Sequence, residues 1–168
     1  MPDISVVMPC WINDEETLEL TVRAVDSIRS AEANLIIVDN GSTMGGGKMR
    51  EMADVYVRNR INLGYAKAVN EGLKLSGPIV AVANNDVLVS PNWWEIGEEI
   101  LVDPTVGTVH FRMIYYDDEF NHGGEIWNTG KERWCTGSFF VMKNKWLFDE
   151  SFLNSYDDWD IQTRIRED

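Results

Sequence analysis

The chain has 168 residues and carries 15 Lys and Arg against 28 Asp and Glu, which gives a formal net charge of −13. This length is typical of one domain, and an apolar content of 44% is enough to build a core. No run of about 18 apolar residues occurs, so the sequence predicts no transmembrane segment. The negative charge argues against nucleic acid or anionic lipid as a partner, because both are polyanions that need clustered Lys and Arg.

Cysteine usage and the N-terminal residues favour a cytoplasmic location. Cys10 and Cys135 are the only cysteines, and no CxxC motif or Cys/His quartet occurs. We therefore expect two buried, reduced thiols rather than a disulfide framework or a zinc site. Residues 1–8 have neither a basic start nor a long apolar stretch, which predicts no secretory signal.

Up to residue 102, short apolar runs alternate with amphipathic stretches. The runs are typical of strands buried on both faces, and apolar residues at helical spacing indicate helices between them. This alternation predicts a parallel sheet covered by helices, with ligands bound beyond the carboxyl ends of the strands. In chain order we expect strand 4–8, helix 15–29, strand 35–38, loop 39–47, strand 54–58, helix 64–75, strand 79–83 and helix 90–101.

Residues at the ends of these elements carry further expectations. Asn13 or Asp14 is expected to cap the first helix, and Ser90 to cap the last one, with Pro91 as its first residue. The glycine-rich segment 39–47 is not followed by a GK[ST] sequence, so it indicates a mobile loop rather than a phosphate-binding P-loop.

After residue 102 the stretches become shorter and more mixed. Segments 107–116 and 138–143 are expected to be strands added antiparallel to the sheet, and a short helix is expected to begin near Asp157. No repeat, low-complexity segment or linker interrupts the chain. The sequence therefore predicts a single domain over residues 1–168.

Polar side chains gather where the predicted strands end. Asp39 ends the second strand and Asn84–Asp86 follow the fourth, so both clusters are expected to meet at one crevice. Beside a diphosphate, Asp86 is a hard oxygen ligand suited to Mg²⁺ or Mn²⁺. Structural alternatives remain open, since Asn-Asn-Asp also favours a turn. In the same way, the acids at 157–160 also stabilise the start of a helix.

Together these segments resemble a known family, the inverting glycosyltransferases of family 2, which have the GT-A fold. The resemblance covers almost the whole chain in order, and the N-N-D form is similar to rhamnosyltransferase-like members. It implies an α/β/α sandwich with a mostly parallel central sheet and a smaller antiparallel C-terminal part. The matching segments read ISVVMPCW, IIVDNGST, RNRINLGYAKAVNEGL, AVANNDVLVSPNWW and FDESFLNSYDDWDIQTRIRED.

The resemblance also implies which residues bind the nucleotide-sugar donor, and it makes 1–102 the nucleotide-binding half. Asp39 is the residue implied to bind the base, and a carboxylate that accepts a ring N–H suits uracil or thymine. We therefore expect a UDP- or dTDP-sugar. Asn70 has a structural alternative, because a buried amide on a helix face needs backbone partners. The implied donor-binding residues are Pro9, Trp11, Asp39, Asn62, Gly64, Asn70, Asn84 and Asn85.

The half 103–168 is implied to hold the acceptor and the catalytic base, with Asp86 of the first half binding Mn²⁺ or Mg²⁺. Asp158 matches the family's base, which takes the proton of an acceptor hydroxyl on a glycan, a lipid-linked molecule or a protein. Its neighbour Asp157 shares the acid pair, and nearby acids are expected to raise the proton affinity of Asp158. The residues implied at the acceptor are Trp134, Gly137 and Ser138.

Three departures from the family pattern affect these expectations. Asn84 replaces the first acid of the D-x-D motif, so it must contact ribose or phosphate as a neutral group. Asp157 replaces a glutamate and is shorter by one methylene. The chain ends ten residues after Asp158, which indicates a compact viral or archaeal type, or a fragment.

Several residues have a structural interpretation beside a functional one. Asp160 is expected to pair with Arg164 four residues later. Trp94 shares a helical stripe with Gly97 and Leu101, which favours core packing. Trp93, Trp127 and Trp134 are candidates for stacking on a sugar. Lys67 either contacts a phosphate or lies on a solvated helix face. His110 and His122 are expected to be mainly structural.

Two other functions are compatible with this fold. A sugar nucleotidyltransferase needs a glycine-rich phosphate loop directly after the first strand, where this chain has Pro9-Cys10-Trp11. A degenerate GT-A domain that only binds a glycan or a sugar nucleotide is the second alternative. Hydrolysis of a sugar nucleotide in the presence of metal would exclude it.

Overall fold

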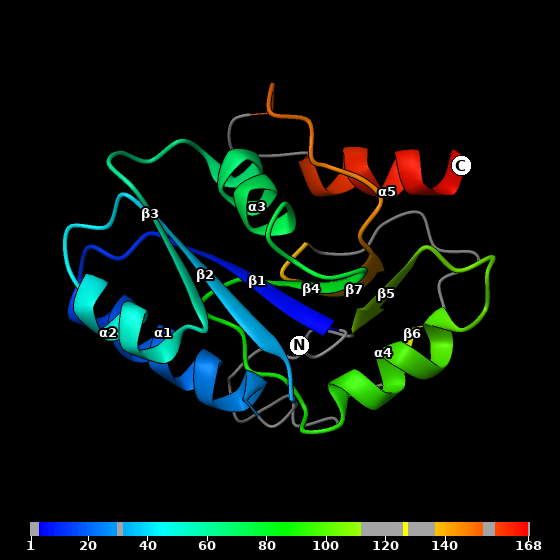
Figure 1. Cartoon of the computed structure of the whole chain (residues 1–168), viewed down its shortest axis with the longest axis horizontal. Coiled ribbons are helices and arrows are strands. Elements are labelled where there is room, and N and C mark those ends of the chain that lie inside the picture. The colour runs from blue at the N-terminus through cyan, green and yellow to red at the C-terminus, as the bar shows by residue number, and fades with distance from the viewer. Residues whose placement is uncertain (1–3, 30–31, 112–125, 128–136, 153–156, 168) are drawn as a thin grey trace, which may run out of the picture.

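The computed structural model describes residues 4–29, 32–111, 126–127, 137–152 and 157–167. In this part of the chain, a seven-stranded sheet has the order β3-β2-β1-β4-β7-β5-β6 and is flanked by helices (Figure 1). The elements are β1 (Ile4–Cys10), α1 (Glu15–Ile28), β2 (Asn34–Asn40), α2 (Gly46–Met52), β3 (Val55–Asn59), α3 (Tyr65–Leu73), β4 (Ile79–Ala83), α4 (Trp93–Leu101), β5 (Thr108–Phe111), β6 (Ile126–Trp127), β7 (Phe139–Lys143) and α5 (Asp157–Glu167).

The first four strands of the chain pair in parallel, with β1 between β2 and β4. Strand β7 is antiparallel to β4, and Ala83 lies opposite Phe139. Strand β5 is antiparallel to β7 and therefore runs in the direction of the first four strands, and β6 is antiparallel to β5. The mostly parallel sheet with an antiparallel C-terminal part is confirmed.

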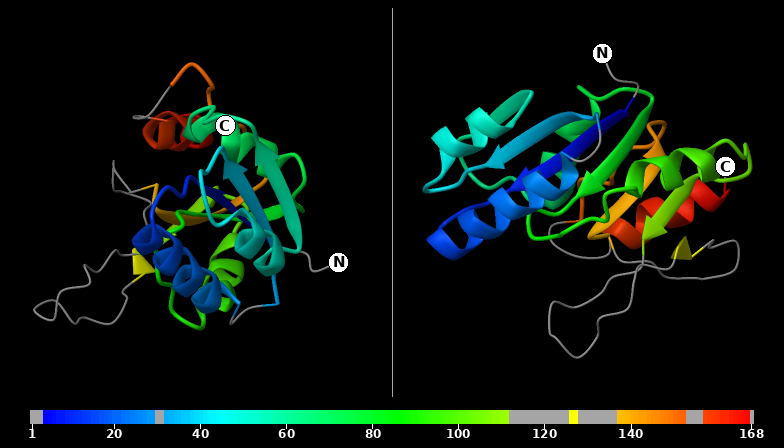
Figure 2. Two further views of the ribbon diagram at one scale, coloured as in Figure 1. Left: turned by 90° about the vertical axis from the view of Figure 1, so that its left-hand side faces the viewer. Right: turned by 90° about the horizontal axis from the view of Figure 1, so that it is seen from below.

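Helices cover both faces of the sheet, because alternate residues of the buried strands are apolar on both sides. On one face Val6 and Met8 pack with residues of α1, α2 and α4, and on the other face Val7 packs with α3 and α5. Figure 2 shows the two helix layers from two further directions. The predicted α/β/α sandwich is confirmed.

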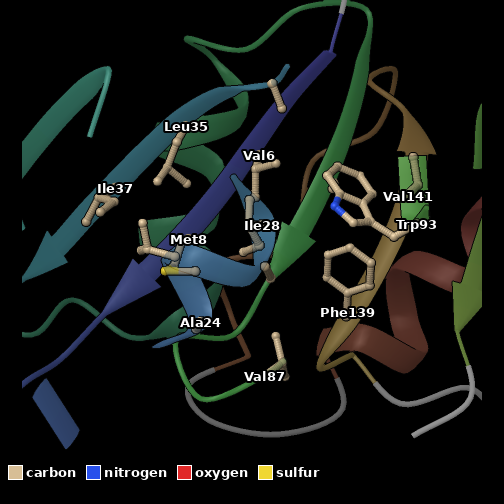
Figure 3. Packing of buried hydrophobic residues seen from close by; sticks show 14 of the residues in the cluster. Val6, Met8, Ala24, Ile28, Leu35, Ile37, Val87, Trp93, Phe139 and Val141 are labelled. Carbon is tan, nitrogen blue, oxygen red and sulfur yellow. The ribbon is translucent and has the colours of Figure 1, made fainter. Parts of the chain in front are cut away.

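Helix α4 is fixed to the sheet by one buried tryptophan. Trp93 is fully buried, and its ring lies edge-on to Phe139 with the centroids 5.3 Å apart (Figure 3). Trp94, which the sequence favoured as the core residue, is only half-buried. The helix begins at Trp93 rather than at Pro91, because the backbone N–H of Trp93 closes a turn onto Ser90 O. Ser90 therefore begins a turn, and Asn92 is the N-cap residue of the helix.

Helix α2 begins inside the segment 39–47 that was predicted as a mobile loop. Met49 of this helix is fully buried in the core, which stabilises seven residues whose sequence has little helical pattern. Gly45 precedes the helix with φ of 75°, a conformation that glycine adopts without strain. The prediction of a loop holds for residues 41–45 and is wrong for Asp39 and Asn40, which lie in β2, and for Gly46 and Gly47, which begin α2.

Two strands run further than the sequence indicated. Strand β1 continues through Pro9 to Cys10, although its pairing with β4 ends at Val7. Proline is tolerated where one edge of a strand has left the ladder. Strand β2 includes both Asp39 and Asn40, which places these polar residues in the sheet rather than in a loop.

Helix caps and cysteines were partly predictable. Asp14 is the N-cap of α1, and its carboxylate accepts the backbone N–H of Thr17 at 2.7 Å. Cys10 is a buried free thiol whose pKa is raised by burial and by the nearby charge of Asp39.

Cys135, His122, Trp134 and the end of the predicted strand 107–116 lie outside the described residues. In the described part of the chain, no helix combines the length and hydropathy needed to cross a membrane.

Candidate functional site

The carboxyl ends of β1 and β2 are joined by hydrogen bonds between the segments that follow them. Ile12 N donates to Ser42 Oγ at 2.8 Å, and Ile12 O accepts from Thr43 N at 3.0 Å. Trp11, which lies between the end of β1 and Ile12, is 56% exposed. The structure therefore places Pro9, Trp11 and the end of β2 in one region, where an aromatic face is open to a ligand.

Asp39 lies at this edge, but its carboxylate is enclosed by protein. Oδ1 accepts from Ser42 N at 2.9 Å, while Oδ2 accepts from Tyr56 Oη at 2.6 Å and from Arg58. The Asp39 side chain is 0% exposed, whereas that of Arg58 is 46% exposed. The direct contact with the base that the sequence implied for Asp39 is not compatible with this arrangement. Asp39 instead holds Arg58 and the loop after β2 in place.

Asn40, which the sequence analysis missed, organises the loop that carries Asn62 and Gly64. Its Nδ2 donates to Asn62 Oδ1 at 2.9 Å and to Gly64 O at 3.1 Å, and its Oδ1 accepts from Leu63 N at 3.0 Å. Asn62 Oδ1 also accepts from Gly64 N. The available signal was an amide residue directly after Asp39 at a strand end. Asn62 and Gly64 therefore shape the start of α3, and Asn62 is exposed.

Asn70 has the structural role that the sequence analysis offered as its alternative. The residue is buried in α3, its Nδ2 donates to Phe148 O at 2.9 Å, and its Oδ1 accepts from Phe148 N at 2.8 Å. Nδ2 also reaches Glu150 Oε1 at 3.1 Å. With its amide satisfied inside the protein, Asn70 does not line the donor site.

The loop after β4 is bonded to helix α1. Asn85 Nδ2 donates to the buried Thr21 Oγ1 at 2.8 Å, and Val89 N donates to Ser27 Oγ at 3.1 Å. Asn85 Nδ2 is therefore directed toward α1 and anchors the loop, while the implied contact of Asn85 with the donor stays a prediction. Asp86, the next residue, is exposed.

Asn84 links this loop to β7. Its backbone N–H donates to Ser138 O at 2.8 Å. Its side-chain Oδ1 is buried and has no hydrogen-bond partner among the described residues. A buried oxygen without a partner is costly in a folded protein, which makes this atom a candidate for contact with a ligand.

Helix α5 brings the acid pair to the same region. Asp158 Oδ2 accepts from Gly137 N at 3.1 Å, and Gly137 and Ser138, both predicted at the acceptor, directly precede β7. Asp157 is 7% exposed, and its Oδ2 has no hydrogen-bond partner within the described ranges. Burial raises the pKa of Asp157, and the charge of Asp158 adds to this rise. Gly137 therefore lies against Asp158, and Ser138 follows it in the chain.

Tyr65 joins these groups and was not predicted as a site residue. Its hydroxyl donates to Gly137 O at 3.5 Å. Burial raises the pKa of this hydroxyl most, and the charges of Asp157, Asp158 and Asp86 raise it further. Carboxylates from the loop after β4 and from α5 therefore all raise the pKa of the same phenol. The only signal in the sequence was a polar aromatic residue directly after Gly64.

Asp160 is separate from this cluster. It accepts from Arg164 Nε at 2.8 Å, one helical turn along α5. The predicted salt bridge is confirmed, and it neutralises an acid that was also considered as a neighbour of the base. His110, expected to be structural, is buried and stacks on Phe140 with ring centroids 5.0 Å apart.

A divalent cation fits this region through Asp86. No group of three His, Cys, Asp or Glu residues that could hold a metal occurs in the part of the chain that the structure describes. The exposed Asp86 carboxylate is a hard oxygen ligand, and the phosphates of a nucleotide would supply the others.

The sheet order and the acids at its carboxyl edge are those of a GT-A fold domain. The sequence model of glycosyl transferase family 2 matches residues 5–157, so the chain belongs to this family. No curated protein sequence matches the chain at a significant level.

Solved structures support the fold. The chain is similar to Staphylococcus aureus TarS residues 1–349, with a TM-score of 0.71 and 15% identity over 97% of this chain. It spans 55% of that protein. The same TarS segment solved with UDP-GlcNAc is similar over 62% of this chain and 32% of its own length, with a TM-score of 0.52 and 16% identity.

A third structure is similar over a shorter stretch. Glucosyl-3-phosphoglycerate synthase from Mycobacterium tuberculosis, solved with Mn²⁺, UDP-glucose and phosphoglyceric acid, gives a TM-score of 0.49 with 22% identity. The likeness covers 64% of this chain and 42% of that protein, and it adds nothing to the fold assignment.

Proposed function

We propose that the chain is the catalytic domain of an inverting glycosyltransferase, which transfers a sugar from a UDP- or dTDP-sugar to a hydroxyl group. The acceptor would be a glycan, a lipid-linked molecule or a protein. The observation that carries this proposal is the contact between Asp158 and Gly137, close to the loop that holds Asp86. A base and a metal-binding acid then face one small region of the protein.

In this proposal Asp158 is the general base. Inversion at the anomeric carbon needs a hydroxyl nucleophile opposite the leaving diphosphate, with a group that takes its proton. Asp158 Oδ1 accepts from Trp159 N at 2.8 Å and Oδ2 accepts from Gly137 N. A carboxylate has about four lone-pair sites, so each oxygen keeps capacity for the acceptor's proton.

Asp86 would hold Mn²⁺ or Mg²⁺ together with the phosphates of the donor. When bound, the cation would offset the charge that develops on the diphosphate as the sugar leaves. The contribution of the chain is to hold Asp86 in place through the Asn85–Thr21 hydrogen bond. The orphaned Asn84 Oδ1 supports a second polar contact with the donor.

The base of the donor would bind beside Trp11 and the Asp39–Arg58 pair. Since Asp39 is enclosed, we assign its role to the positioning of Arg58 rather than to the base. A TarS structure with UDP-GlcNAc supports a uridine donor for a chain of this fold.

The test combines nucleotide binding with slow turnover. Calorimetry would compare UDP, dTDP and GDP, each with Mn²⁺ and with EDTA, and UDP release would be followed from UDP-glucose and UDP-GlcNAc with water as acceptor. The proposal predicts tighter binding of UDP or dTDP than of GDP, and metal-dependent UDP release. Metal-dependent binding without any release would favour the degenerate domain that only binds its ligand.

A further inference from the structure

Gly137 occupies a position where no side chain fits. A Cβ atom on this residue would lie 2.7 Å from Asp158 Cβ and 3.0 Å from Asp158 Oδ2. Its backbone N–H donates to the same oxygen at 3.1 Å. The start of helix α5 is therefore packed directly against the backbone before β7, and glycine is what allows this approach.

The backbone of residues 137–138 also contacts the donor half of the protein. Ser138 O accepts the backbone N–H of Asn84 at 2.8 Å, next to the loop of Asp86. Gly137 O accepts from the Tyr65 hydroxyl at 3.5 Å. One dipeptide thus touches the loop after β4, the start of α3 and the start of α5.

We infer that Gly137 is a positioning residue for catalysis, which fixes the Asp158 carboxylate relative to the donor-binding loop through its backbone N–H and its lack of a side chain. This inference deepens the proposed function and rests on it. It replaces the acceptor contact that the sequence implied for Gly137.

The physical reason is the geometry that a base needs. A carboxylate that accepts one backbone amide on each oxygen has its plane fixed, as Asp158 does through Trp159 N and Gly137 N. A displacement of about 1 Å in a catalytic group can cost about 10²-fold in rate. A methyl group at residue 137 must displace either Asp158 or the strand, because the contact is shorter than van der Waals distance.

The first experiment compares Gly137→Ala with alanine substitutions at two glycines outside the site. A Cβ on Gly47 meets nothing within 4 Å, and a Cβ on Gly97 lies 3.3 Å from Val141 in the core. For each variant, calorimetry measures UDP binding with Mn²⁺, and UDP release from UDP-glucose gives kcat and KM. Thermal unfolding shows whether each variant is folded.

We expect Gly137→Ala to lower kcat by about 10²-fold, with UDP affinity and KM for UDP-glucose unchanged. Gly47→Ala and Gly97→Ala should keep kcat, even if Gly97→Ala unfolds at a lower temperature. A folded Gly137→Ala protein with wild-type kcat would overturn the inference. So would an equal loss of kcat in Gly97→Ala, because the effect would then reflect general packing.

The second experiment does not depend on turnover. With uniformly ¹³C,¹⁵N-labelled protein, the Gly137 amide resonance is assigned from triple-resonance spectra and compared between wild type, Asp158→Ala and Asp160→Ala at one pH. The inference predicts a large upfield shift of the amide proton in Asp158→Ala only. An unchanged resonance in Asp158→Ala contradicts the inference. This outcome can be measured even if Gly137→Ala does not fold and gives no kinetic data.

The two experiments separate this inference from the proposed function. If Asp158→Asn keeps wild-type turnover, the assignment of the base is wrong, and with it the role of Gly137 in catalysis. If Asp158→Asn is inactive while the Gly137 amide is unaffected by Asp158→Ala, the base assignment stands and the positioning role of Gly137 is wrong.

Discussion

Asn70 of α3 binds the backbone of Phe148 with both ends of its side-chain amide, donating to the carbonyl at 2.9 Å and accepting from the N–H at 2.8 Å. Phe148 lies in the segment that leads from β7 to helix α5, where Asp157 and Asp158 begin the helix. This pair therefore connects helix α3 to the segment that carries the proposed base.

We predict that Asn70→Ala lowers the free energy of unfolding by about 2 kcal/mol, because both backbone groups of Phe148 lose a buried partner. Urea unfolding monitored by tryptophan fluorescence measures the change. Glu99→Ala is the control, since Glu99 is exposed on α4 and its loss should cost within about 0.5 kcal/mol. Equal stabilities of the two variants would show that the Asn70 clamp is unimportant.

Asp39→Asn is predicted to lower the free energy of unfolding by about 2 kcal/mol, because the buried side chain at residue 39 loses its charged hydrogen bond with Arg58 beside the half-buried Tyr56. Tyr56→Phe removes only one neutral donor and should cost about 1 kcal/mol. Chemical unfolding of both variants, with calorimetry of UDP, provides the measurement. If the Asp39→Asn protein has unchanged stability but has lost UDP affinity, the result would support a direct contact between Asp39 and the base.

The pH dependence of stability should report the buried Asp157. Its pKa is raised above the ordinary 3.8 by burial, so the stabilising contribution of its protonated form is complete below that pH. The contribution is lost as the pH rises through the raised pKa of the folded state. We therefore expect Asp157→Asn, which cannot titrate, to gain stability relative to wild type between pH 3.8 and neutrality.

The comparison needs thermal or urea unfolding of both proteins at several pH values. Asp103 provides a control of opposite sign, because hydrogen bonds from Thr105 lower its pKa. Asp103→Asn should therefore lose stability relative to wild type above the ordinary pKa and approach it in acid. A difference between wild type and Asp157→Asn that does not change with pH would contradict the raised pKa.

The role of Asp86 predicts a specific effect of metal. Mn²⁺ should increase the affinity for UDP in wild type, and Asp86→Ala should remove this increase while the affinity in EDTA stays the same. Glu98→Ala is a matched control, since Glu98 is an exposed acid on helix α4. Calorimetry with Mn²⁺ and with EDTA decides the question, and equal UDP affinity in both conditions for wild type would remove the metal from the account.

The Asn85–Thr21 hydrogen bond should contribute to the same metal effect. Thr21→Val removes the hydroxyl that Asn85 contacts, while Thr21→Ser keeps it. We expect the first variant to lose part of the Mn²⁺-dependent increase in UDP affinity and the second to retain it. The same loss in both variants would indicate an effect of repacking around residue 21 rather than loss of the hydroxyl.

Sequence patterns predicted the sheet and the edge where the acids gather, because strand ends follow from apolar runs. They did not predict which way individual side chains point. Asn85 turns toward α1 and Asn70 toward Phe148, and both directions depend on partners far away in the sequence. Residues chosen by motif position alone therefore included some that hold the fold together.

The same limitation explains what was missed. Helix α2 depends on the burial of Met49, and its glycine-rich sequence carries no periodic signal. Tyr65 enters the site only because β7 and α5 lie beside the start of α3. Asn40 was overlooked because its partners, Asn62 and Gly64, are recognisable only in the folded loop.

The central claim, that Asp158 is the base, is tested most directly by Asp158→Asn. The amide keeps the shape of the side chain, caps a helix about as well as aspartate and still accepts a hydrogen bond, but it takes no proton. The measurement is kcat for UDP release from UDP-glucose with Mn²⁺, together with the Kd for UDP. The account predicts a fall in kcat of about 10² to 10⁴-fold with Kd unchanged, and an Asp158→Asn protein with wild-type kcat would contradict it.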